Sequence, residues 1–117
     1  MIDRHEHDEL RALALTSVRG GRLDTAQVLL DGLTALDPHD VWSARHAAEV
    51  ACARGDGPRA LVAAEAWMHV APRDAAATRT SARALFLLGR FEEGRARMKH
   101  AARLGDSLAA TWLRCRR

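Results

Sequence analysis

The sequence predicts an all-α protein built as a right-handed α-solenoid, in which three helical hairpins stack and a last helix caps the array. Two observations lead to this prediction. The chain is rich in alanine, leucine and arginine and poor in β-branched residues, which favours helix over sheet. Glycines recur at a fixed spacing, because Gly21, Gly55 and Gly89 are each 34 residues apart. We expect a single domain over residues 1–117, because a chain of this length is too short for a second core.

The repeat extends well beyond these glycines. Small residues, apolar residues and prolines recur at the same spacing, namely Ala26, Ala60 and Gly94; Leu36, Val70 and Leu104; and Pro38 and Pro72. Asp106 takes the place of the third proline. A period of 34 with small residues, an apolar face and a proline after each second helix is typical of tetratricopeptide repeats (TPR).

The glycines and prolines also predict where the helices end. Glycine closes a first helix because it adopts the left-handed conformation without strain, and proline follows a second helix because it cannot continue one. We therefore expect helices over residues 6–19, 23–36, 41–53, 58–70, 75–88 and 91–104, with a capping helix over about 107–115. The repeats then span about 7–40, 41–74 and 75–106, and their short connections make neighbouring helices antiparallel.

The first helices of such repeats line a concave groove, and we expect this groove to bind a protein partner. The residues at the lining positions are Arg11, Leu15, Val18, Arg19, Trp42, Arg45, Glu49, Cys52, Arg79, Arg83, Phe86 and Leu87. Among them Arg11, Arg45 and Arg79 recur at the repeat period and form a ladder of positive charge. An apolar surface edged by arginine fits an amphipathic helix or extended segment with acidic flanks.

A simpler interpretation stays open beside this one. The arginines could be ordinary solvated side chains of an arginine-rich protein, and Leu15, Val18 and Phe86 could be part of the core. The clamp with which some TPR proteins hold the C-terminal carboxylate of heat-shock chaperones is absent. Of the residues at its positions, Arg11, Leu15, His46, Ala76 and Thr80, only the first carries the required charge.

Catalytic and metal-binding patterns are missing from the sequence. His5, Glu6 and His7 lack the His-Glu-x-x-His spacing of a metal-binding helix, so we interpret them as part of a frayed, solvated N-terminus. There is no glycine-rich phosphate loop, and no serine lies in a nucleophile elbow. The sequence therefore predicts neither an enzyme nor a protein with a metal or other cofactor.

The net charge of +3 favours an acidic partner over nucleic acid, because the chain has no tyrosine and only two phenylalanines for base stacking. The N-terminus has no apolar run, and no apolar stretch is long enough to insert in a membrane. We therefore expect a cytoplasmic protein.

Two segments resemble a known family. The first runs from Gly21 to Leu33 and continues as Leu36-Asp37-Pro38-His39. The second contains Arg54-Gly55-Asp56-Gly57-Pro58-Arg59-Ala60 followed by Glu65-Ala66-Trp67. Over about residues 10–105 the chain resembles the small TPR chaperones of bacterial type III secretion, most closely the YscY-type (SctY) chaperones, with the needle-subunit chaperones as close rivals.

This resemblance implies a cytosolic chaperone that holds a small secreted export partner, the X-type protein, soluble as a heterodimer. It also implies a contact with the inner-membrane export apparatus. Two other functions stay open: a general TPR adaptor or scaffold for complex assembly, and a basic nucleic-acid-associated protein, whose binding would fall steeply with salt.

Overall fold

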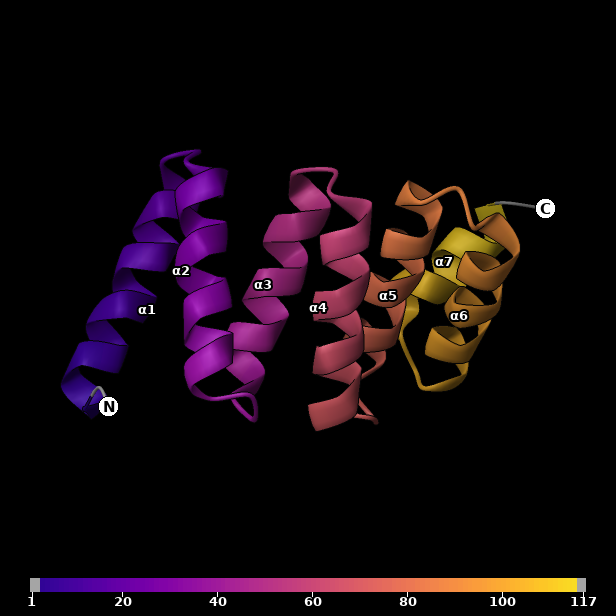
Figure 1. The fold of residues 1–117 in the computed structure, drawn as a ribbon. Helices are drawn as coiled ribbons and strands as arrows, with labels where there is room; N and C mark the ends of the chain where they lie inside the picture. Colours follow the sequence, from indigo (N-terminus) through magenta and orange to yellow (C-terminus); the bar gives the residue numbers. More distant parts are fainter. Residues whose placement is uncertain (1–2, 116–117) are drawn as a thin grey trace.

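The computed structural model describes residues 3–115, which fold into seven α-helices and contain no strand. These are α1 (Arg4–Arg19), α2 (Leu23–Leu36), α3 (Val41–Ala53), α4 (Gly57–Val70), α5 (Ala75–Leu87), α6 (Phe91–Arg103) and α7 (Ser107–Cys115). Figure 1 shows them side by side in chain order, as an elongated array of 48 × 26 × 20 Å. The predicted all-α solenoid of helical hairpins is confirmed. No helix in residues 3–115 is long and apolar enough to span a bilayer.

The expected helix boundaries agree with the structure to within one or two residues. The largest difference is at the start of α1, which begins at Arg4 because the carboxylate of Asp3 accepts a hydrogen bond of 2.8 Å from the backbone N–H of Glu6. Such a cap satisfies one of the free N–H groups of the first turn. The prediction of a frayed, solvated N-terminus is therefore wrong as to fraying, because His5, Glu6 and His7 all lie within α1, but His5 and Glu6 are exposed to solvent as expected.

The three repeated glycines have the conformation that the sequence predicts. Their φ angles are +75° at Gly21, +72° at Gly55 and +75° at Gly89, in the left-handed region. In each turn the residue after the glycine donates a backbone hydrogen bond to the carbonyl five residues earlier, as from Asp56 to Ala51 at 3.0 Å. This pattern ends one helix and starts the next within a few residues.

The end of the third hairpin explains why the repeat breaks at Asp106. Gly105 has a φ of +102°, and the N–H of Asp106 bonds to the carbonyl of Ala101 at 3.0 Å, as in the glycine turns above. Asp106 then caps α7 by accepting a hydrogen bond of 2.8 Å from the N–H of Ala109. A glycine turn thus replaces the proline turn that follows the first two hairpins.

The core differs in kind along the array. In the first hairpin leucines such as Leu30 and Leu33 fill the interface between the helices. The middle of the array is built largely from alanine, and the buried ring of Trp67 occupies the volume that the small side chains leave.

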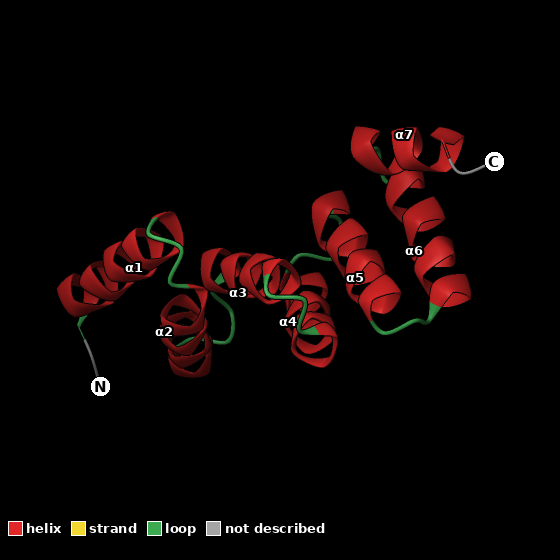
Figure 2. Ribbon diagram, turned by 90° about the horizontal axis from the view of Figure 1, so that it is seen from above, coloured by secondary structure: helices red, strands yellow, loops and turns green. Residues whose placement is uncertain are grey.

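The array has two distinct sides. Seen from above, in Figure 2, α1, α3 and α5 lie on one side and α2 and α4 on the other, and α7 at the far end lies toward the side of α1, α3 and α5. We call the side formed by α1, α3 and α5 the inner face and the side formed by α2 and α4 the outer face.

Candidate functional site

The junction of α1 and α3 on the inner face is organised around the carboxylate of Asp40. Its Oδ1 accepts a hydrogen bond of 3.2 Å from the N–H of Trp42, which caps α3. Its Oδ2 accepts hydrogen bonds of 2.6 Å both from the hydroxyl of Ser43 and from the guanidinium of Arg11. Burial, the largest single influence, raises the pKa of Asp40, but the hydrogen bonds and the charge of Arg11 together outweigh it, so the pKa lies below its ordinary value.

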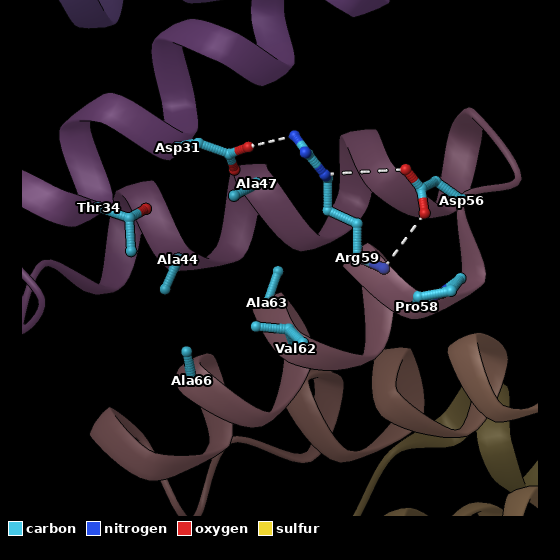
Figure 3. Close-up of a pocket in the computed structure, with 10 residues that line it drawn as sticks. All are labelled: Asp31, Thr34, Ala44, Ala47, Asp56, Pro58, Arg59, Val62, Ala63 and Ala66. Atoms are coloured by element: carbon cyan, nitrogen blue, oxygen red, sulfur yellow. Dashed lines mark hydrogen bonds and ion pairs between the residues drawn. The ribbon is translucent and has the colours of Figure 1, made fainter.

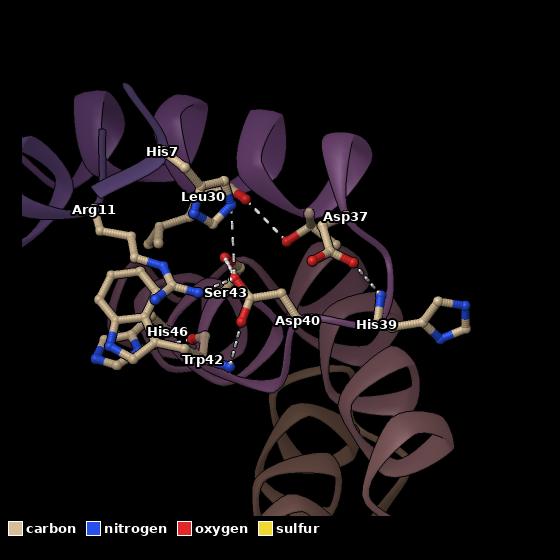
Figure 4. A network of polar contacts seen from close by, with 10 residues as sticks. His7, Arg11, Leu30, Asp37, His39, Asp40, Trp42, Ser43 and His46 are labelled. Atoms are coloured by element: carbon tan, nitrogen blue, oxygen red, sulfur yellow. Dashed lines mark hydrogen bonds and ion pairs between the residues drawn. The ribbon is translucent and has the colours of Figure 1, made fainter. Parts of the chain in front are cut away.

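The same junction holds the indole of Trp42 in place. The guanidinium carbon of Arg11 lies 5.0 Å from the centre of the Trp42 ring, within the range of a cation–π contact. The ring of His46 stacks on Trp42 at 4.1 Å, and its Nδ1 lies 2.8 Å from the Trp42 carbonyl oxygen. Figure 4 shows these side chains around Asp40, with His7 above them and its Nε2 3.9 Å from Oδ2 of Asp40. Trp42 is therefore a half-buried aromatic side chain in a fixed orientation.

The arginine ladder has a different role from the one that the spacing suggested. Arg11 pairs with Asp40, and Arg79 pairs with Asp106 at 3.1 Å, so both bind the capping aspartate of the next first helix. Arg45 instead pairs with Glu49, one turn further along α3, at 3.0 Å. Only Arg45 is largely exposed, at 56% of its side chain against 32% for Arg11 and 27% for Arg79. Arg11 therefore joins the first hairpin to the second, and Arg79 joins the third hairpin to the capping helix α7.

Cys52 is part of the core and not part of an accessible groove lining. It is 3% exposed and packs with Ala51, Ala60 and Ala84. Burial raises the pKa of its thiol, Arg83 lowers it and Glu49 raises it.

Two of the apolar residues that were predicted to line the groove pack against other helices instead. Val18 packs against the core of the first hairpin. Phe86 lies so close to Gly94 of α6 that a Cβ at Gly94 would be 2.5 Å from its ring, and it stacks on Trp112 at 5.0 Å. The core interpretation is therefore correct for Val18 and Phe86, both of which keep partial exposure.

The remaining predicted residues lie on α1 and α5 and are at least partly exposed. Leu15 is half-buried, Leu87 is 44% exposed, and Arg19 and Arg83 are exposed. Within the described part of the chain no carboxylate lies at ion-pair distance from Arg83. The inner face thus presents a fixed indole, two leucines and a free guanidinium, which is a surface suited to a protein segment with apolar and acidic side chains.

Sequence reasoning missed a groove on the outer face, between α2 and α4. Its floor includes Ala44 and Ala47, which occupy the repeat positions of Leu10 and Leu13 in the first hairpin. The sequence could have indicated this groove, because alanine replaces leucine at both matched positions of the middle hairpin and small residues at an interface leave space. In residues 3–115 no three His, Cys, Asp or Glu side chains are grouped so that they could hold a metal ion.

No family model matches the chain, and no curated protein matches it. The fold is similar to several solved structures. The type III secretion translocator chaperone SycD of Yersinia enterocolitica superposes with a TM-score of 0.84 at 16% identity, over 97% of this chain and 92% of SycD. The first TPR of Spaghetti (RPAP3), bound to the HSP90 peptide SRMEEVD, gives 0.83 at 16% identity, over 97% and 91%.

A third neighbour is the protein MamA of strain AMB-1, with a TM-score of 0.78 at 21% identity. The match covers 84% of this chain but only 58% of the MamA chain, so the chain spans a little over half the length of that neighbour. At these identities the likeness concerns the fold alone, and it places the chain among TPR-type helical-repeat structures.

Proposed function

We propose that this protein is a non-enzymatic TPR chaperone or adaptor that binds a segment of another protein on its inner face. The observation that carries the proposal is the fixed, partly exposed indole of Trp42 on α3, held by Arg11 and His46, together with the exposed Arg83 on α5, which has no ion-pair partner in residues 3–115. Tryptophan and arginine are the side chains most often found at binding hot spots. Similarity to SycD, a chaperone, and to a TPR that holds a peptide supports the same class of function.

The contacts of the inner face indicate which residues the partner uses. Arg11 cannot serve as a free cation, because removing it from Asp40 would leave a carboxylate that is only 9% exposed without its charge partner. Arg19, Arg45 and Arg83 are the exposed guanidiniums among the predicted residues, so acidic groups of the partner pair with them. Trp42 is already ordered by its neighbours, so binding to it loses little side-chain entropy.

The specific form of the proposal is a cytosolic chaperone of the YscY (SctY) type in bacterial type III secretion. Its partner would be the small X-type export protein, held soluble in a one-to-one heterodimer and presented to the inner-membrane export apparatus. The sequence resemblance over about residues 10–105 and the similarity to SycD support this form. A general TPR adaptor is the alternative, because the same inner face would serve it equally well.

Affinity capture of the tagged chain from its native cytosol, followed by intact-mass analysis, tests the proposal. The chaperone form predicts one small protein in a one-to-one ratio, encoded beside secretion genes. Many unrelated proteins in the eluate would favour the adaptor. Capture of nucleic acid that is lost steeply as salt rises would contradict both.

Two substitutions locate the binding surface once the partner is known. Trp42→Ala and Arg83→Glu should each weaken the partner's affinity by about tenfold or more, as expected for hot-spot residues. Arg95→Glu, at an exposed position of α6, is the matched control and should leave the affinity unchanged. Equal affinity for all three variants would place the partner elsewhere and refute the inner-face site.

A further inference from the structure

The outer face carries a second surface that the proposed function does not use. A groove of about 610 Å³ lies between α2 and α4, floored by the small side chains of Ala44 and Ala47 from α3 and walled in part by Ala63 and Ala66 from α4. Figure 3 shows these alanines around the open space, with Val62 beside them. Val62 is 72% exposed, so a large apolar side chain lies uncovered at the edge of the groove.

Beside the groove, α2 presents an exposed stripe that includes one large apolar side chain. Asp24, Val28, Asp31 and Ala35 follow the spacing that puts side chains on one stripe of a helix, and Val28 is 70% exposed. Gly32 lies next to this stripe, and a Cβ placed on it would meet nothing within 4 Å. Glycine inside a helix costs stability relative to alanine, and no contact within this chain requires it here. A bare backbone at this point allows another helix to approach α2 closely.

The charged side chains at the groove have a net negative charge. Arg59 reaches from α4 to Asp31 of α2 at 2.7 Å, and its Nε lies 3.8 Å from Asp56, so two carboxylates share one guanidinium. Asp24, which pairs with Arg54, adds a carboxylate that is 91% exposed on the same stripe of α2. Within the lining of the groove the two carboxylates of Asp31 and Asp56 therefore face the single guanidinium of Arg59, and α2 itself has no basic residue, in a chain whose net charge is +3.

We propose that this outer groove binds an amphipathic helix of a partner protein, with an apolar ridge facing the alanine floor and basic residues along one flank. The ridge fills the space above Ala44 and Ala47 and covers Val28 and Val62. The basic flank lies against Asp24, Asp31 and Asp56, where it balances the surplus carboxylate. This partner differs from the one at the inner face, which meets arginines there and requires acidic groups.

The test uses the folded full chain and a displayed library of amphipathic peptides with a constant apolar ridge and randomised flanks. Peptides selected on the chain should be enriched in lysine and arginine on one flank. Val62→Lys and Ala66→Leu should each reduce their affinity by about tenfold or more, the first by repelling the basic flank and the second by filling the groove. Because the second variant adds no charge, it separates loss of space from loss of charge complementarity.

Two controls separate this surface from others. Leu108→Lys, on α7 at 63% exposure, places the same charge on a different exposed apolar residue and should leave peptide affinity unchanged. Trp42→Ala should also leave it unchanged, so a failure of the inner-face proposal is distinguishable from a failure of this one. Circular dichroism of each variant shows that it is folded before binding is measured.

The proposal is overturned if the library yields no binding peptide, if the selected flanks are acidic or random, or if Val62→Lys and Ala66→Leu bind the peptides as well as the original chain. It is also overturned if sedimentation shows that the chain alone forms a dimer that Val62→Lys disperses, because the groove is then occupied by a second copy.

Discussion

Gly94→Ala is the change for which helix propensity and packing predict opposite results. Alanine in a helix interior is favoured over glycine by about 1 kcal/mol, so propensity alone predicts a more stable chain. In α6, however, the new Cβ would lie 2.5 Å from Cε1 and 2.7 Å from Cδ1 of Phe86. Carbon atoms in contact normally lie about 3.5 to 4 Å apart, so either the ring or the helix must move.

The surroundings of Phe86 decide how much this movement costs. Its ring stacks on Trp112 at 5.0 Å and on Phe91 at 6.4 Å, so a shift disturbs two further aromatic contacts. Adding a methyl group to a well-packed site costs about 1 to 3 kcal/mol. After the gain in propensity is subtracted, we expect Gly94→Ala to lower the free energy of unfolding by up to about 2 kcal/mol.

Urea denaturation followed by circular dichroism measures this change, and Gly32→Ala provides the control. Gly32 is exposed in the middle of α2 with open space around its Cα, so alanine there should stabilise the chain by up to about 1 kcal/mol. Replacing Phe86 by leucine in the Gly94→Ala chain should recover part of the loss, because the two sites are in contact. A Gly94→Ala chain that is more stable than the original by about 1 kcal/mol, as propensity alone predicts, would refute the close contact between α5 and α6.

Three further predictions concern acid stability, thiol reactivity and the middle core. The depressed pKa of Asp40 means that its stabilisation is present above the unfolded pKa and lost as the pH falls through the folded pKa. Asp40→Asn should therefore lower the free energy of unfolding by about 1 to 3 kcal/mol at pH 7, as measured by urea titration. Below about pH 4 the free energy of unfolding should fall less steeply with decreasing pH in this variant than in the original chain. An unchanged dependence on acid pH would contradict this. A thiol reagent at neutral pH should label exposed Cys115 quickly and buried Cys52 only after unfolding, as read by intact mass; equal labelling rates would show that Cys52 is accessible. Trp67→Ala should cost about 3 to 5 kcal/mol in urea denaturation, because it empties the buried volume of the middle hairpin, and a loss below about 1 kcal/mol would contradict that role.

The hairpins could be predicted from the sequence because their ends depend on local backbone chemistry. A glycine with a positive φ is needed at Gly21, Gly55 and Gly89 wherever the rest of the chain lies, so a repeat of glycines predicts a repeat of turns. The same rule would have identified Gly105 as a fourth such turn. The repeat pattern predicts a proline turn at position 106, so Gly105 was not interpreted as a turn glycine.

The roles of the inner-face residues depended on contacts between helices, which the repeat period does not encode. The positions of Arg11, Arg45 and Arg79 are equivalent in sequence, yet two of them bind a capping aspartate and one binds a glutamate on its own helix. Which carboxylate a long side chain reaches depends on the spacing of neighbouring helices. Cys52 was misplaced for the same reason, because the close approach of α3 and α5 covers it.

The spacing of the first helices connects the two candidate surfaces. Alanines on both sides of the interface, such as Ala48 and Ala77, let α5 pack directly against α3, whereas α1 and α3 have little backbone contact. At the wider junction the side chains of Arg11 and Trp42 span the distance between the helices, which leaves the indole partly open on the inner face. On the outer face α4 packs against α3 and α5 but makes little contact with α2, so a groove remains between α2 and α4. The outer groove therefore follows from Ala44 and Ala47, which stand where the first hairpin has Leu10 and Leu13, and the opening on the inner face follows from the wider spacing of α1 and α3.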